Sequence, residues 1–261
     1  MPETIAEPWW GSVPREGASS WSGRMGPLRL WLTSAEGEHT LAWSQNADPL
    51  MEGRSDGGGG EPDDSWERAR VVTRQPTLVL APALADRPVV VRPELPLHLA
   101  PGDEATLLVS TPVWIQVTAG DPLHPLLEVP TFRPSDTWFG PSPRVGELCY
   151  ASRTRARLEA NASTSTFARA QTLLTVGNRA HDVLLIERIN LPVPRLALFE
   201  AADGVLWSES LSVVRSDGEG FAEVTIRRGP PERLASARPI AEPRNPDSRN
   251  VFARAVSSLL G

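Results

Sequence analysis

Short apolar segments that alternate with polar residues recur through most of this chain, and no helical pattern separates them. From Trp66 onward these segments include TLVLAPA, PVVV, ATLLVS and QTLLTV. Pro, Gly, Asp and Ser bound each of them, as is typical of strands joined by turns. Strands that follow one another without intervening helices favour antiparallel sheets. The sequence therefore predicts an all-β fold, either one antiparallel β-sandwich or two abutting sandwiches.

Two regions carry the clearest hairpin signals. Residues 28–33 and 39–44 both alternate apolar with polar residues, and a short Gly-containing loop separates them. Near the end of the chain, turns at Asp203-Gly204 and Asp217-Gly218 connect three apolar segments. Asp-Gly between alternating segments is a strong hairpin signal. This second region predicts a three-strand meander.

Composition divides the chain into four parts. We expect residues 1–45 to form a Trp-rich N-terminal hairpin that packs on the body, and residues 46–65 to form a flexible, acidic, Gly-rich excursion. Residues 66–230 would form the all-β body, which could split near 130–146. Residues 231–261 would form a Pro-rich tail with a helix.

The end of the chain predicts a short amphipathic helix. Asp247 or Ser248 would cap it, and Phe252, Val256 and Leu259 would lie on one stripe. A helix of about twelve residues is marginal alone in water, so we expect it to dock on the sheet or on a partner.

Several classes of function are excluded by composition. All 26 basic residues are Arg, and chemistry that requires Lys, such as a Schiff base or a P-loop, is therefore ruled out. The net charge of −6 argues against a nucleic-acid footprint over the whole surface. The single cysteine, Cys149, forbids an internal disulfide and a Cys-rich zinc site. The histidines show no metal-ligand spacing, and no cofactor is expected.

The termini and apolar runs indicate a location. The amino terminus lacks a basic region followed by an apolar run, and the longest apolar runs are too short to cross a bilayer. We expect a cytoplasmic protein without membrane insertion and without a nucleic-acid partner.

The segment 128–157 holds the most unusual mixture of residues. Its prolines exclude a regular helix and predict a rigid loop that leads into a strand. Trp138 and Phe139, with Arg133 and Asp136 close by, could line a pocket for a sugar or an adenine ring. Alternatively, the aromatic side chains pin the loop to the sheet.

Arg153, Arg155 and Arg157 follow at every second position, so on a strand their side chains would share one face. Such a stripe could bind an anionic ligand or an acidic partner surface. The alternative is a solvated face paired with Asp or Glu on neighbouring strands. The candidate contact residues are Arg133, Asp136, Trp138, Phe139, Arg153, Arg155 and Arg157, and no catalytic or metal-binding residue is assigned.

Two further residues in this segment could carry chemistry. Glu147 and Asp136 could form a pair of carboxylates for acid–base catalysis, although the sequence does not fix their distance. Cys149 lies between Leu148 and Tyr150 on an expected strand. Because a nucleophilic thiol needs a cationic, partly exposed setting, we expect Cys149 to be buried and inert.

Three segments occur in order along the chain: RPVVVRPELPLHLAPGDEATLLVSTPVWIQV, FGPSPRVGELCYASRT and RNVFARAVSSLLG. They resemble an uncharacterised prokaryotic family, domain of unknown function 432, from about Arg87 onward, with the Trp-rich start and the tetraglycine outside the resemblance. The resemblance implies a bacterial protein without an established reaction. Some members are associated with small mechanosensitive channels, which implies an accessory role beside a membrane protein.

The leading hypothesis is a non-catalytic, cytosolic β-sandwich protein that binds a partner protein through segment 128–157 and the C-terminal helix. The alternative is a sensory or enzymatic module that binds a small anionic ligand or a sugar through the same loop and strand. The sequence leaves the oligomeric state open.

Overall fold

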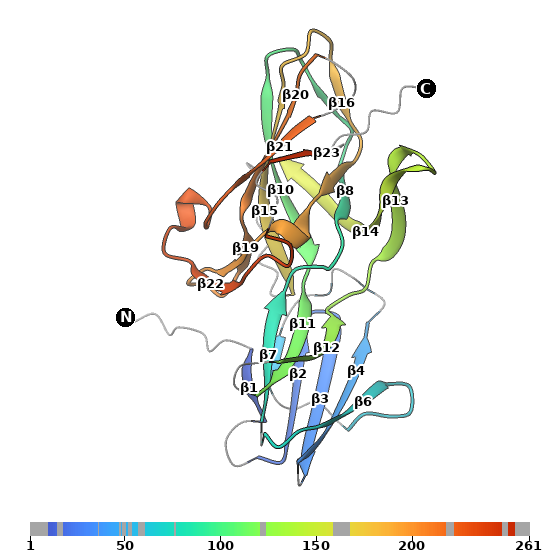
Figure 1. Cartoon of the computed structure of the whole chain (residues 1–261), viewed down its shortest axis with the longest axis vertical. Helices are drawn as coiled ribbons and strands as arrows, with labels where there is room; N and C mark the ends of the chain where they lie inside the picture. The colour runs from blue at the N-terminus through green and yellow to red at the C-terminus, as the bar shows by residue number, and fades with distance from the viewer. Residues whose placement is uncertain are drawn as a thin grey trace. The chain divides into compact units, whose positions relative to one another are not determined.

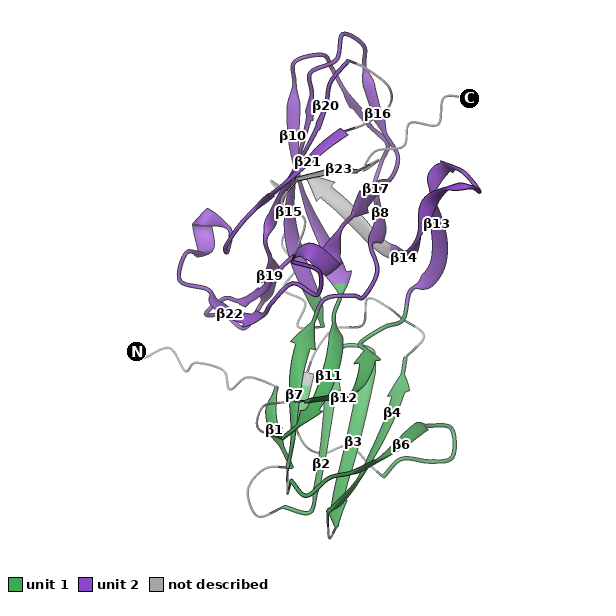
Figure 2. Cartoon of the chain, in the orientation of Figure 1, with its two compact units in different colours: residues 1–83, 112–133, 166–169 green, residues 84–111, 134–165, 170–261 purple. Residues whose placement is uncertain are grey.

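The computed structural model describes an all-β chain (Figure 1). It covers residues 10–14, 18–35, 37–46, 48, 51, 54–56, 61–75, 77–120, 124–158, 168–217, 222–246 and 250–253. The chain forms two compact units, each of which combines segments far apart in the sequence (Figure 2). Unit 1 contains residues 1–83, 112–133 and 166–169, and unit 2 contains residues 84–111, 134–165 and 170–261.

Unit 1 contains two antiparallel sheets. One has the order β5-β2-β3-β4-β6, and the other has the order β1-β7-β11-β12. The strands are β1 (Gly11–Val13), β2 (Ser20–Met25), β3 (Leu28–Ala35), β4 (Glu38–Gln45), β5 (Arg54–Asp56), β6 (Glu67–Val72), β7 (Leu78–Ala83), β11 (Trp114–Ala119) and β12 (His124–Pro130).

The hairpin predicted at residues 28–44 is confirmed as β3 and β4. These strands pair from Leu28 opposite Gln45 to Ala35 opposite Glu38. The connecting turn includes Gly37 with φ of 84°, a conformation that glycine adopts without strain. Alternate residues of β3 are buried, as expected for a strand with one face on the core.

Unit 2 is built on a 12-stranded sheet path and a separate two-stranded sheet of β9 and β16. The main path runs β17-β8-β14-β10-β15-β19-β18-β22, with β13 beside β14, β20 beside β15 and β21, and β23 beside β21. The strands are β8 (Val89–Pro93), β9 (Leu97–Leu99), β10 (Glu104–Pro112), β13 (Ser135–Ser142), β14 (Val145–Leu158), β15 (Arg169–Asn178), β16 (Leu184–Ile186), β17 (Ile189–Leu191), β18 (Leu198–Glu200), β19 (Leu206–Ser208), β20 (Ser210–Arg215), β21 (Ala222–Arg227), β22 (Arg238–Ala241) and β23 (Asn250–Ala253).

The all-β, mainly antiparallel fold class is confirmed, and some strand pairs among the described residues are parallel. β14 runs parallel to β8, and β15 runs parallel to both β19 and β20. The predicted meander appears as the antiparallel pairs β18–β19 and β20–β21. Its middle segment is divided into β19 and β20 at Glu209. This buried carboxylate accepts hydrogen bonds from Ala197 N, Gly229 N and Arg228 Nη1.

The predicted C-terminal helix is wrong for residues 250–253, which form strand β23. This strand pairs with β21 in an antiparallel register, with Phe252 opposite Glu223. Pairing with an existing sheet edge satisfies backbone groups without the cost of starting a short helix. The proposed cap at Asp247 or Ser248 and residues 254–261 lie outside the described residues.

The Pro-rich stretch before β23 contains regular structure. The 3₁₀ turn η3 (Glu232–Leu234) and strand β22 lie within it, and a second 3₁₀ turn, η2 (Val193–Arg195), precedes β18. Within the described ranges, no helix is long and apolar enough to span a membrane.

Candidate functional site

The most distinctive surface feature of unit 2 is the hairpin formed by β13 and the first part of β14. It extends away from the rest of the unit (Figure 2). In its antiparallel register, Asp136 lies opposite Tyr150 and Trp138 opposite Leu148. Cross-strand partners share a face, so these residues form one face of the hairpin and Phe139 belongs to the other.

The second face of the hairpin is covered where it meets β8. Phe139 and Cys149 are buried and form a core cluster with Val90 of β8. The guanidinium carbon of Arg188 lies 5.3 Å from the centre of the Phe139 ring, within cation–π distance. Phe139 therefore anchors the hairpin to the unit.

Cys149 is buried, as the sequence predicted. Its Sγ atom lies 3.6 Å from both Glu147 O and Asn190 Oδ1. Burial raises the pKa of the Cys149 thiol to about 12, and the charge of Glu147 adds to this rise. A thiol that stays protonated near neutral pH is a poor nucleophile.

The first face of the hairpin exposes large apolar side chains. Trp138 is 42% exposed and its cross-strand partner Leu148 is 46% exposed. We call Trp138 and Leu148 the hairpin patch. Val145 at the turn is 47% exposed, but it alternates with Glu147 and Cys149 and therefore belongs to the other face. The Trp138 ring is held in place because Nε1 donates a hydrogen bond to Ser142 O at 2.9 Å.

Gly146 allows the Trp138 ring and the two strands to approach closely at the hairpin turn. A Cβ atom at this position would lie 2.5 Å from Phe139 O and 2.7 Å from Trp138 Nε1. Atoms at such distances overlap, so a side chain here would force the hairpin open. The shape of the hairpin patch therefore depends on glycine at position 146.

A cluster of charged residues fixes the base of the hairpin. Arg87 Nη1 donates to Asp136 Oδ1 at 3.1 Å, and the Arg87 guanidinium carbon lies 5.3 Å from the centre of the Tyr150 ring. The Tyr150 hydroxyl donates to Asp86 Oδ1 at 3.0 Å. These contacts tie β13 to the segment before β8 and neutralise Asp136 locally.

The structure brings together only part of the predicted contact set. Asp136 and Trp138 lie two residues apart on one face of β13, whereas Phe139 belongs to the covered face. Arg133 is exposed and belongs to unit 1, while β13 belongs to unit 2.

The three arginines of the predicted stripe lie on β14, whose strand conformation over residues 145–158 is confirmed. The register of β14 against β8 shifts between Ala151 and Arg155, and Arg155 then lies opposite Arg92. The side chains of Arg153, Arg155 and Arg157 lie outside the described residues. Their role as a shared contact surface stays a prediction.

The hypothetical pair of catalytic carboxylates does not form. Asp136 lies opposite Tyr150, whereas Glu147 lies opposite Phe139, which places the two residues on opposite faces of the hairpin. Glu147 Oε1 accepts a hydrogen bond from Asn190 Nδ2 at 2.7 Å. Each carboxylate is therefore engaged with a different partner.

Sequence reasoning missed Arg87 and the exposure of Val145 and Leu148. Arg87 lies 49 positions before its partner Asp136, and no local pattern connects them. Leu148 could have been recognised, because it alternates with Cys149 and therefore faces away from the side on which a buried cysteine packs.

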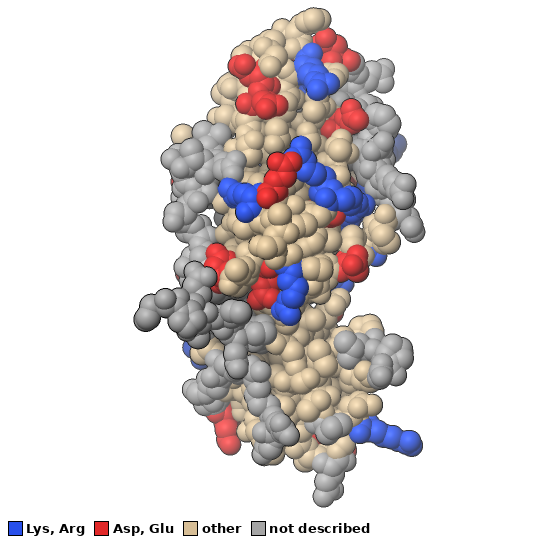
Figure 3. Space-filling view, turned by 90° about the vertical axis from the view of Figure 1, so that its left-hand side faces the viewer, with Lys and Arg blue, Asp and Glu red and all other residues tan. Residues whose placement is uncertain are grey.

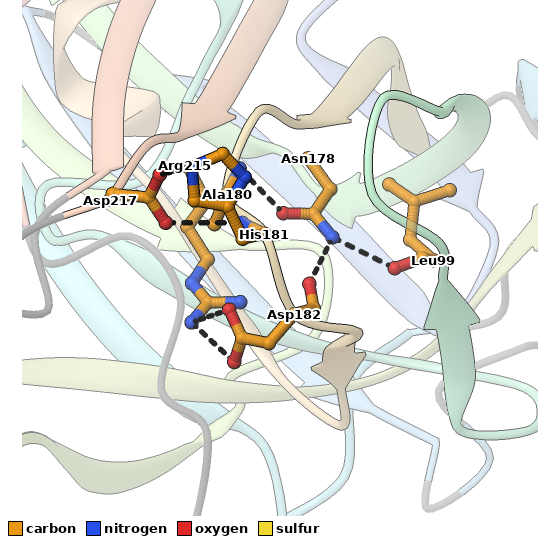
Figure 4. A network of polar contacts seen from close by, with 7 residues as sticks. All are labelled: Leu99, Asn178, Ala180, His181, Asp182, Arg215 and Asp217. Carbon is orange, nitrogen blue, oxygen red and sulfur yellow. Dashed lines mark hydrogen bonds and ion pairs between the residues drawn. The ribbon is translucent and has the colours of Figure 1, made fainter.

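A second polar cluster lies at the end of β15 (Figure 4). Asn178 Nδ2 donates to Leu99 O and Asp182 O, and these bonds hold the loop after β15 against β9. Arg215 pairs with Asp182 at 2.9 Å and lowers the pKa of that carboxyl group, mainly by hydrogen bonding. His181 contacts Asp217 through its backbone N and its ring. The cluster fixes a loop.

Several charged side chains elsewhere on the surface are paired with one of opposite sign. On the face drawn in Figure 3, basic and acidic side chains are interspersed. Exposed pairs in unit 2 include Arg227–Glu232 at 2.8 Å and Arg238–Glu200 at 2.6 Å. Over the described ranges, no group of three or more His, Cys, Asp or Glu residues could hold a metal ion.

The fold and the hairpin define an all-β protein with an exposed apolar surface on a projecting pair of strands. The chain belongs to the family described as "Protein of unknown function (DUF432)", whose profile matches residues 9–260. The match includes the Trp-rich start and the tetraglycine, so the extent predicted from the sequence was too short. Comparisons with curated proteins and with solved structures give no match.

Proposed function

We propose that this protein is a partner-binding module that docks through the β13–β14 hairpin. The observation that carries the proposal is the cross-strand pair Trp138 and Leu148, which are 42% and 46% exposed although Phe139 and Cys149 on the opposite face of the same hairpin are buried. Aromatic residues that are held in place but remain exposed are typical anchors of protein interfaces.

The hairpin patch offers enough apolar surface to serve as the centre of an interface. A Trp side chain carries roughly 250 Å² of surface at most, so roughly 100 Å² of Trp138 remains open at 42% exposure. Removing that area from water contributes about 2.5 kcal/mol. Leu148 adds to this contribution, which a partner would gain without reorganising the hairpin.

The geometry supports binding over catalysis in this segment. Asp136 is paired with Arg87, Glu147 is bonded to Asn190, and the thiol of Cys149 has its pKa raised to about 12. The two carboxylates are thus engaged with different partners, and the thiol stays protonated near neutral pH. The large apolar side chains exposed on the hairpin favour another protein surface.

The family resemblance extends the proposal to a cytoplasmic accessory role. A membrane protein with a cytosolic face, such as a mechanosensitive channel, is the partner class that the resemblance supports. The arginines of β14 would then bind an acidic surface of the partner beside the hairpin patch.

Quantitative co-purification from cells that make the protein tests this proposal. We expect a protein that co-purifies with the tagged wild type to be lost with Trp138→Glu and with Leu148→Glu. Val183→Glu serves as the matched control, because Val183 is also an exposed apolar residue of unit 2, at 54%, and lies outside the hairpin. Equal recovery of the same partners by all four proteins would reject the hairpin as the docking surface.

A small-ligand module would give a different result. Co-purification would then be unaffected, and a thermal-shift screen with sugars, nucleotides and acidic metabolites would show stabilisation that Trp138→Ala removes.

A further inference from the structure

The outer edge of β13 is a second binding feature of the same hairpin. Among the strands of the described residues, only β14 pairs with β13. An edge strand presents backbone N–H and C=O groups that can pair with another chain. The occupant that satisfies such a row best is another extended strand.

This edge lacks the usual protection over its first five residues. Edge strands are commonly guarded by charge, proline or a bulge. Between Ser135 and Phe139 the only charged residue is Asp136, and its carboxylate is bonded to Arg87. Protection begins only afterwards, where the register with β14 shifts and Pro141 lacks a backbone donor. An added strand would therefore pair with residues 135–139.

The side chains beside this edge set the chemistry of the occupant. On the exposed face, Leu148 and Trp138 form a row across β14 and β13. A residue of an added strand opposite Trp138 would continue this row, and cross-strand pairs with an aromatic residue favour apolar or β-branched side chains. The neighbouring positions of the added strand would face the other side. The occupant is thus an extended segment with apolar residues at alternate positions.

A second copy of the chain fits the edge less well. The hairpin patch exposes on the order of 200 Å², well below the roughly 800 Å² that each partner contributes to a standard interface. Two copies would also each carry a net charge of −6 into the contact. A strand that belongs to a different protein avoids this repulsion and can bring additional surface.

We infer that the hairpin takes its partner by β-strand addition, with an extended segment of another protein pairing along residues 135–139 and an apolar side chain against Trp138. The inference rests on the proposed partner-binding function and specifies its mode. Main-chain hydrogen bonds would supply affinity, and the alternating side chains would supply selectivity.

Selection of peptides tests the inference with the full-length protein. The probe is a phage-displayed library of random dodecapeptides, panned on the wild type, on Trp138→Glu and on the control Val183→Glu. We expect enriched peptides with apolar residues at alternate positions. They should bind the control as tightly as the wild type and bind Trp138→Glu at least about 30-fold more weakly. Leu148→Glu provides a second variant should Trp138→Glu fold poorly, as judged by circular dichroism.

Backbone methylation of a selected peptide separates strand addition from side-chain docking. N-methyl groups at alternate residues remove donors on one side of the peptide, and each lost hydrogen bond weakens binding about 2- to 10-fold. Methylation in one of the two alternating sets should abolish binding, and the other set should be tolerated. The absence of Trp138-dependent peptides, or equal tolerance of both sets, would overturn the inference.

Two further outcomes are informative. Sedimentation that shows dimers of the wild type and monomers of Trp138→Glu would assign the edge to a second copy and overturn the inference. Loss of co-purifying partners with Trp138→Glu, combined with tolerance of both methylated sets, would overturn strand addition while leaving the proposed docking function in place.

Discussion

The buried thiol of Cys149 provides a sensitive measure of how tightly the hairpin packs on unit 2. Its pKa is raised from the ordinary value of 9.0 to about 12, so at pH 8 the thiolate population is about 1000-fold lower than in the unfolded chain. Because a more basic thiolate is intrinsically more nucleophilic, by roughly 20-fold over this range, ionisation alone slows the reaction about 50-fold. Exclusion of the reagent by Phe139 and Val90 slows it further.

The assay is labelling with a chromogenic disulfide reagent at pH 8, in native buffer and in denaturant. We expect native labelling to be at least about 50-fold slower than in the denatured protein. Phe139→Ala should accelerate native labelling because it removes the cover, whereas Trp138→Ala, on the opposite face, should leave it slow. Native labelling within about 5-fold of the denatured rate would refute the packing described for the covered face.

Three other predictions follow from individual contacts. Stability should fall by up to about 1.4 kcal/mol per pH unit as pH rises from 9 toward 12, because the unfolded thiol of Cys149 ionises first, and urea titrations of Cys149→Ala should lack this component. Gly146→Ala should lower the free energy of unfolding by about 1–3 kcal/mol, because the added Cβ would overlap Phe139 O. The control Gly177→Ala, whose Cβ meets Val214 at an ordinary 3.7 Å, should lower it by less than about 1 kcal/mol in the same titrations. Glu209→Ala should lower the free energy of unfolding by about 3 kcal/mol because three hydrogen bonds are lost. The exposed Glu232→Ala should lower it by less than about 0.5 kcal/mol. Equal values for the two variants would contradict a structural role for the buried carboxylate.

The parts of the fold that the sequence predicted depend on local patterns. The hairpin of β3 and β4 has regular alternation and a glycine turn, and both survive unchanged in the structure. A long strand was predicted over residues 147–158, after the Pro-rich loop, and the structure has β14 at Val145–Leu158. The burial of Cys149 followed from its apolar neighbours on that strand.

The parts that the sequence did not predict depend on distant partners. The parallel pairing of β14 with β8 joins residues about sixty positions apart, and nothing in either segment specifies the other. The contact of Arg87 with Asp136 likewise joins two segments whose sequences do not specify each other. At the C terminus, the local helical pattern around Phe252 was overridden by the open edge of β21, because tertiary pairing outweighs the weak preference of a short segment.

Within the predicted site, Trp138 was singled out by its type and its neighbours, but its exposure was not deducible. That exposure results from which face of the hairpin packs on β8, and this depends on Val90 and Phe139. Nothing in the sequence distinguished Phe139 from Trp138, although the two side chains lie on opposite faces of the hairpin.

Site-specific photo-crosslinking tests the docking surface most directly. A photoreactive phenylalanine analogue at position 138, in the full-length protein and in cells that make it, samples only what contacts the hairpin patch. The same analogue at position 183 samples an equally exposed position of unit 2 outside the hairpin. We predict a discrete adduct with another protein from position 138 and none from position 183. Identical adduct patterns at both positions, or no adduct from position 138, would contradict partner binding through the hairpin.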